Sequence, residues 1–122
     1  MKVLVVDDNI QMRKLLQITF AKKATYEVLQ AENGEEALNI SHTQHIDIMF
    51  LDIMMPGIDG LEVCKLVKNS DYKSCFIVLL SAKGQKSDIE LGLNMGADMY
   101  LTKPFSPLAL LEIAEQFEAT LT

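Results

Sequence analysis

Three aspartates stand where two apolar segments of the chain end, and they are the most informative chemical groups in the sequence. Asp7 and Asp8 follow the apolar residues 3–6, and Asp52 follows the apolar residues 48–51. Short, near-continuous apolar runs are typical of strands in a parallel sheet that is buried on both faces. Because the carboxyl ends of parallel strands share one edge of the sheet, we expect the three carboxylates to lie close together.

Clustered carboxylates favour the binding of a cation. Two such charges about 4 Å apart repel each other by roughly 1–4 kcal/mol at the effective dielectric constants found near protein surfaces. A ligand set made only of oxygens suits a hard cation, so we expect Mg²⁺, with Mn²⁺ as the alternative. Asp7 or Asp8 alone also fits a simpler role as an acid at a helix N-terminus, which the helix dipole stabilises by a few tenths to about 1 kcal/mol.

Two further polar groups follow apolar runs in the same way. Ser81 follows residues 76–80, and Lys103 follows residues 99–102. A metal, a carboxylate, a hydroxyl and an ammonium group at one edge of a sheet indicate phosphoryl chemistry. Taken singly, Ser81 fits an ordinary strand-end cap and Lys103 fits a solvated cation, so it is the combination that predicts the chemistry.

The composition limits the class of protein. The chain has 122 residues, enough for one domain with a single core, and a net charge of −6. Binding to a nucleic acid depends on clustered Lys and Arg, so this charge argues against a nucleic-acid partner. No apolar run approaches the roughly 18 residues of a membrane span, and the N-terminus has no signal-peptide pattern. We therefore expect a cytoplasmic domain that binds no membrane, with Cys64 and Cys75 reduced and structural.

The elements that must position these groups alternate along the chain. Five strand-like runs are each followed by a helical pattern, which predicts an α/β fold with a parallel sheet. The strands are expected at residues 2–6, 26–31, 46–51, 76–80 and 99–102. In the fourth helix, Gly92 and Gly96 should each lower helix stability by roughly 1 kcal/mol relative to Ala.

The first and last helices show a clear apolar stripe. The stripe residues are Met12, Leu15, Leu16, Thr19 and Phe20 in the first helix, and Leu110, Ile113, Ala114, Phe117 and Leu121 in the last. Ser106 and Pro107 are the expected N-cap and first residue of the last helix. Leu108 and Leu111 lie off its stripe, and a patch that binds a partner protein is one interpretation of them.

In this order, the motifs resemble the receiver domain of two-component response regulators over the whole chain, residues 1–122. That family has an acidic pair after the first strand and a phosphate-accepting Asp after the third, with a Met-Pro-Gly-x-[Asp or Asn]-Gly loop. A Ser or Thr follows its fourth strand, and Lys-Pro follows its fifth. The matching residues are Asp7 and Asp8, Asp52, Met55-Pro56-Gly57-Ile58-Asp59-Gly60, Ser81, and Lys103-Pro104. The resemblance implies a flavodoxin-like (βα)5 domain with strand order 2-1-3-4-5.

The resemblance also implies the chemistry of the site. Asp52 would take a phosphoryl group from a phosphohistidine, with Ser81 and Lys103 as the other catalytic residues. The implied Mg²⁺ ligands are Asp7, Asp8, Asp52 and the backbone carbonyl of Met54. The chain would then be a phosphoacceptor that catalyses its own phosphorylation and slow dephosphorylation, not an enzyme with a separate substrate.

A switch and a set of partners follow from the same resemblance. Ser81 would move toward Asp52 on phosphorylation and leave space for the ring of Tyr100, which would reshape the face made by the fourth helix, fifth strand and fifth helix. The implied partners are a sensor histidine kinase or phosphotransfer protein, an output domain or partner protein, and a second copy of the chain on phosphorylation. The bond between Lys103 and Pro104 is expected to be cis, because the family's lysine reaches the site through that bend.

Three other classes of protein share some of these features. A phosphatase with an aspartyl nucleophile normally carries it after the first strand as Asp-x-Asp, whereas Asp7 and Asp8 are adjacent. A flavin-binding electron carrier needs a first loop that binds phosphate, which this acidic pair would repel. A receiver-like protein that acts by contact alone has no chemical need for all five features. Incubation with acetyl phosphate and Mg²⁺ distinguishes these classes.

Overall fold

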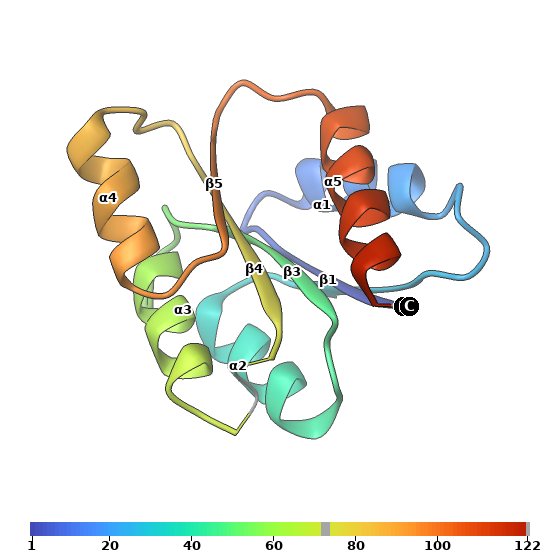
Figure 1. Ribbon diagram of the computed structural model, residues 1–122, viewed down its shortest axis with the longest axis horizontal. Helices are drawn as coiled ribbons and strands as arrows, with labels where there is room; N and C mark the ends of the chain where they lie inside the picture. The colour runs from blue at the N-terminus through green and yellow to red at the C-terminus, as the bar shows by residue number, and fades with distance from the viewer. Residues whose placement is uncertain (72–73, 122) are drawn as a thin grey trace.

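Five short strands lie side by side in a parallel sheet, and helices cover both of its faces (Figure 1). The computed structural model describes residues 1–71 and 74–121. In chain order the elements are β1 (Lys2–Val6), α1 (Ile10–Phe20), β2 (Glu27–Ala31), α2 (Gly34–Thr43), β3 (Ile48–Asp52), α3 (Gly60–Lys68), β4 (Phe76–Ser81), α4 (Lys86–Asn94), β5 (Met99–Thr102) and α5 (Pro107–Thr120). The strand order is β2-β1-β3-β4-β5, which confirms the predicted flavodoxin-like topology.

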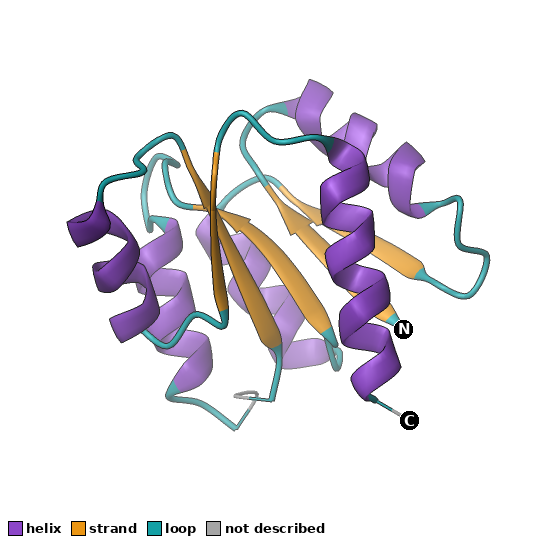
Figure 2. Cartoon of the chain, turned by 45° about the horizontal axis from the view of Figure 1, so that its top comes forward, coloured by secondary structure: helices purple, strands orange, loops and turns teal. Residues whose placement is uncertain are grey.

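Alternation along the strands divides the apolar core into two layers. In β1, Val3 and Val5 pack with residues of α1 and α5, whereas Leu4 and Val6 pack with residues of α2 and α3. Figure 2 shows the sheet between these helices. Because helices cover both faces, β1, β3 and β4 are buried along almost their whole length, which explains why their sequences are apolar without interruption.

Side chains at the edge of the sheet fix where the helices begin. Asn9, Asn33, Asp59 and Ser106 precede α1, α2, α3 and α5, and each side chain accepts a hydrogen bond from a backbone N–H of the first turn. Ser106 and Pro107 occupy their predicted positions in α5. The peptide bond between Lys103 and Pro104 is cis, as expected.

The predicted buried stripes are wrong at three leucines. Leu15 and Leu121 are 45% and 52% exposed, because Leu16 and Phe20 fill the sheet side of α1 and Leu121 lies beyond the last residue of α5. Leu111, predicted to lie off the stripe, is buried because α5 packs against α1 as well as against the sheet. The interpretation of Leu108 and Leu111 as an exposed patch is therefore wrong, since only Leu108 is exposed.

Some boundaries also differ from prediction. β2 begins at Glu27 and β3 at Ile48, later than expected, and β3 includes Asp52. Gly96 lies beyond the end of α4 with a φ of +105°, so only Gly92 interrupts that helix. Cys64 and Cys75 are buried free thiols, in agreement with prediction. No helix in residues 1–71 and 74–121 has the length and apolar character needed to span a membrane.

Two glycines shape the loop that joins β3 to α3. Gly57 has a φ of +78°, in the left-handed region that glycine adopts without strain. A Cβ atom at Gly60 would overlap the carbonyl oxygen of Asp52 and lie 2.7 Å from the Cα atom of Ile53. The first turn of α3 therefore passes so close to the end of β3 that only glycine fits there.

We expect Gly60→Ala to lower the free energy of unfolding by about 1–3 kcal/mol, because the new methyl group meets backbone that has no room to move. Without this overlap, alanine at a helical position would be stabilising by about 1 kcal/mol, so the sign of the change is informative. Urea denaturation measures it. Gly57→Ala is the control for backbone strain alone, since nothing lies within 4 Å of a Cβ atom there. A Gly60→Ala variant as stable as the parent would contradict the packing described.

Candidate functional site

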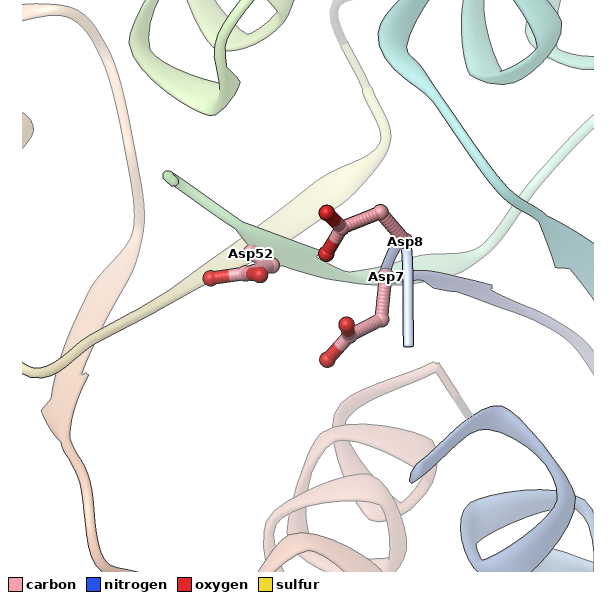
Figure 3. A group of neighbouring side chains, drawn as sticks. All are labelled: Asp7, Asp8 and Asp52. Atoms are coloured by element: carbon pink, nitrogen blue, oxygen red, sulfur yellow. The ribbon is translucent and has the colours of Figure 1, made fainter. Parts of the chain in front are cut away.

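The carboxyl ends of β1 and β3 bring three carboxylates together (Figure 3). Asp7 and Asp8 follow β1, Asp52 is the last residue of β3, and one oxygen from each side chain lies within 4.8 Å of the others. The two strands are neighbours, with Val6 beside Leu51, which sets this proximity. Asp7 and Asp52 are only 3% and 2% exposed, whereas Asp8 is open to solvent. The structure therefore places one exposed and two buried acids in a single cluster.

Burial dominates the electrostatics of this cluster. Burial raises the pKa of Asp52 above its usual value, although Lys103 and the backbone N–H of Met54 favour the charged form. Burial also raises the pKa of Asp7, against a hydrogen bond from the backbone N–H of Asn9 to its carboxylate at 2.9 Å. Both carboxylates thus carry a desolvation cost that their protein neighbours do not fully offset, and a bound cation would relieve it.

Ser81 is the last residue of β4, the strand next to β3, and Lys103 follows β5. The Lys103 Nζ atom is 3.3 Å from Asp52 Oδ1, and the backbone N–H of Lys103 donates to the Ser81 carbonyl at 2.8 Å. Ser81 is 1% exposed, and its Oγ accepts a hydrogen bond from the backbone N–H of Lys83 at 3.0 Å. Because Oγ is the acceptor in this bond, the hydroxyl proton can be donated to another group at the site.

The loop after β3 brings Met54 to the same place. Its side chain is 57% exposed, and its backbone N–H lies 3.4 Å from Asp52 Oδ1. The main chain of Met54 is therefore beside the acid cluster. The sequence analysis predicted which residues provide the carboxylates, the hydroxyl, the ammonium group and the carbonyl. All of these residues lie at the same edge of the sheet.

Tyr100 connects this edge to α4. Its hydroxyl donates to the Lys83 carbonyl at 2.6 Å, and its ring packs on Gly92, where a Cβ atom would lie 2.7 Å from Cδ2 of the ring. Ser81, Met54 and Tyr100 also line a small cavity of about 120 Å³. One ring thus contacts α4 and the loop that follows Ser81, and it borders the cavity beside the acid cluster.

Arg13 is a residue near the site that sequence reasoning missed. It is 9% exposed, and its Nη1 atom donates to the backbone carbonyl of Asp7 at 2.6 Å. Its position three residues before the buried Leu16 was the available signal, because residues three apart lie on the same face of a helix. Arginine counts as polar in a hydrophobic pattern, so the pattern alone did not predict its burial.

The chain is similar to known proteins over most of its length. The family model described as the response regulator receiver domain matches residues 3–115. The alkaline phosphatase synthesis transcriptional regulatory protein PhoP of Bacillus subtilis is 46% identical over 107 residues, which cover 87% of this chain and 43% of that protein. The probable transcriptional regulator ycf27 of Guillardia theta is 46% identical over 110 residues, covering 89% and 42%. The chain thus spans less than half the length of these relatives.

A solved structure extends the comparison to three dimensions. The chemotaxis protein CheY4 of Vibrio cholerae superposes with a TM-score of 0.86 at 35% sequence identity. The match covers 95% of this chain and 97% of that one. The similarity therefore includes nearly the whole fold, and not only the edge of the sheet that carries the acids.

We expect Asp52→Asn to be more stable than the parent at pH 7 without divalent cations. The pKa of Asp52 is raised above 3.8, its ordinary value, so the folded state binds the proton more tightly than the unfolded state. The free energy of unfolding then decreases as the pH rises from about 3.8 through the pKa of Asp52 in the folded state, and this loss persists at neutral pH. The asparagine variant avoids it, so the difference should vanish below about pH 3.8.

Urea denaturation in EDTA at several pH values measures this difference. Glu35→Gln, an exposed acid in the first turn of α2, is the control and should be slightly less stable at pH 7. An Asp52→Asn variant less stable than the parent at pH 7 would mean that the ion pair with Lys103 outweighs burial.

Proposed function

This chain belongs to the response regulator receiver family, and on that basis we propose that Asp52 accepts a phosphoryl group from the phosphohistidine of a sensor histidine kinase or phosphotransfer protein. The observation that carries this proposal is the setting of Asp52. Its buried carboxylate lies in a cluster with two other acids, and the Lys103 ammonium is 3.3 Å away. A nucleophile that belongs to a cation-binding cluster and lies beside a positive charge suits the transfer of an anionic group.

The acid cluster fits a divalent cation of the Mg²⁺ or Mn²⁺ type. Its three carboxylates are close enough to share one ion, and two of them are buried with a raised pKa. We assign Asp7, Asp8, Asp52 and the backbone carbonyl of Met54 as its protein ligands; few are needed, because Mg²⁺ retains several waters. When bound, the ion supplies charge neutralisation at the phosphoryl oxygens.

Asp52, Lys103 and Ser81 then have separate roles in the transfer of the phosphoryl group. A carboxylate oxygen of Asp52 attacks phosphorus, the bond from phosphorus to the histidine nitrogen breaks, and that nitrogen keeps the electron pair. The product is an acyl phosphate on Asp52. Lys103 and the hydroxyl of Ser81 bind the equatorial oxygens, where negative charge concentrates in the loose transition state. The protein's part is therefore positioning and charge neutralisation.

A conformational switch would carry the signal away from Asp52. The phosphoryl group attracts the Ser81 hydroxyl and Lys103, and the movement of Ser81 opens room for the ring of Tyr100. Since Tyr100 packs on Gly92 and bonds to the Lys83 carbonyl, a change in its position alters the face formed by α4, β5 and α5.

This face would control an output domain or a partner protein. The relatives named transcriptional regulators are more than twice as long as the matched region. This length supports an output domain as the part that responds to the signal. A homodimer formed on phosphorylation is a second way to use the same face. The phosphoacceptor itself needs no nucleic-acid contact, in keeping with the charge of −6.

We expect incubation with Mg²⁺ and acetyl phosphate to add the mass of one phosphoryl group. Asp52→Asn or EDTA should abolish the addition, and hydroxylamine should remove it, as it cleaves acyl phosphates. Intact-protein mass spectrometry measures the adduct, and Asp59→Asn, an exposed acid that caps α3, is the control for general loss of acidity. Phosphate mapped to a serine or tyrosine would refute Asp52 as the acceptor. No adduct would favour a receiver-like protein that acts by contact alone.

We expect the beryllofluoride complex, a mimic of the phosphorylated state, to show Ser81 Oγ closer to Asp52 and a changed position of the Tyr100 ring. A crystal structure of the complex beside one of the free protein measures both movements. The reason is the added negative charge at Asp52, which draws in the Ser81 hydroxyl. Unmoved Ser81 and Tyr100 in the complex would rule out the coupled switch while leaving phosphorylation possible.

A further inference from the structure

Arg13 is a charged residue in an unusual environment. It lies on α1 with 9% of its surface exposed, and within residues 1–71 and 74–121 no carboxylate forms an ion pair with it. Burying a guanidinium without an ion-pair partner is costly, and an apolar residue of similar size would usually be more stabilising. The one hydrogen bond recorded for its guanidinium goes to the backbone carbonyl of Asp7, at 2.6 Å.

That carbonyl belongs to the peptide unit that joins the two neighbouring acids. A peptide unit is planar, so fixing the direction of its carbonyl restrains rotation about the bonds on either side of it, and with it the directions in which the Asp7 and Asp8 side chains leave the backbone. The N–H of Asp7, in the preceding peptide unit, donates to the Ala31 carbonyl of β2 at 3.1 Å. Arg13 supplies a contact from α1, and because its donor is ionised this hydrogen bond is charge-assisted.

The directions in which both carboxylates point depend on the orientation of this peptide unit. Figure 3 shows that Asp7 and Asp8 project from the end of β1 toward the side on which Asp52 lies. The Asp7 carboxylate has its own bond to the N–H of Asn9, whereas Asp8 is exposed. Rotation of the peptide between them would turn the exposed Asp8 carboxylate away from the cluster.

We propose that Arg13 is a positioning residue for the cation site, which orients the Asp7–Asp8 peptide so that both carboxylates face the same ion. This inference rests on the proposed function, because it assumes that the cluster binds Mg²⁺. It concerns a side chain that would not contact the ion itself. Removing such an outer contact typically weakens metal binding by about 10-fold to 100-fold, and we expect the lower end here.

The sign of the effect separates positioning from simple electrostatics. Arg13 is a cation, so if it acted only through its charge, its removal would reduce repulsion and tighten Mg²⁺ binding. A positioning role predicts the opposite, which is weaker binding. Lys14 is the matched control, because it is the next residue of the same helix, carries the same charge and is exposed.

The experiment is a calorimetric titration with Mg²⁺ on the parent chain and on Asp8→Asn, Lys14→Met, Arg13→Met and Arg13→Lys. Circular dichroism first shows which variants are folded at the temperature of the titration. We expect Asp8→Asn to lose binding, Arg13→Met to bind about tenfold more weakly, and Lys14→Met to stay within about twofold of the parent, because exposed charges are screened. Arg13→Lys should fall between the parent and Arg13→Met, since it keeps the charge and one donor group but not the planar fork.

The outcomes distinguish the inference from the proposed function. Parent-like or tighter binding by Arg13→Met, with Asp8→Asn impaired, would overturn the role of Arg13 and leave the cation site standing. If Arg13→Met does not fold, Arg13→Lys decides in its place, and parent-like binding by that variant would overturn the role. A parent chain without measurable Mg²⁺ binding, or an unimpaired Asp8→Asn, would overturn the cation site and the inference together.

Discussion

The structure depends on one electrostatic constraint, which is that negative charge is concentrated at a buried edge of the sheet. Asp7 and Asp52 are almost fully buried, and Asp8 stands beside them. A fold selected only for stability would not place acids there, because burial and mutual repulsion both disfavour their charged forms. The parallel sheet nevertheless forces the contact, since β1 and β3 are neighbours and end at the same level.

The surrounding structure offsets this cost in several small ways. Lys103 reaches Asp52 from the turn after β5, and backbone N–H groups bond to the carboxylates of Asp7 and Asp52. These contacts do not neutralise the cluster, because one ammonium group lies beside three carboxylates. What remains is a site whose protein groups favour an added positive charge.

The sequence allowed the sheet and the convergence of the acids to be predicted because both follow from short-range patterns. Uninterrupted apolar runs mark strands with two covered faces, and the ends of these runs mark one edge. Helix packing was less predictable. Leu15 was expected to be buried and is exposed, whereas Leu111 was expected to lie off the buried stripe and is buried. The side of a helix that is buried depends on which neighbouring elements the helix packs against.

The hydrogen-bond partners of Arg13 and Tyr100 could not be predicted in this way. Each depends on a side chain that reaches a particular backbone carbonyl, Asp7 for Arg13 and Lys83 for Tyr100. Such contacts are set by rotamers and by the path of a loop, and neither leaves a periodic signal in the sequence. The roles of the site residues remain predictions that rest on the geometry and on membership of the family.

The contacts of Tyr100 have a consequence for any protein that binds near α4 and β5. The ring touches Gly92, and its hydroxyl holds the carbonyl of Lys83, only two residues after Ser81. A partner that prefers one position of this ring would shift its population, and binding equilibria that are coupled in this way are reciprocal, by typically 1–3 kcal/mol. The partner would therefore act back on the edge of the sheet as strongly as that edge acts on the partner. The output domain or partner protein that responds to the signal would then also help to set how long the signal lasts.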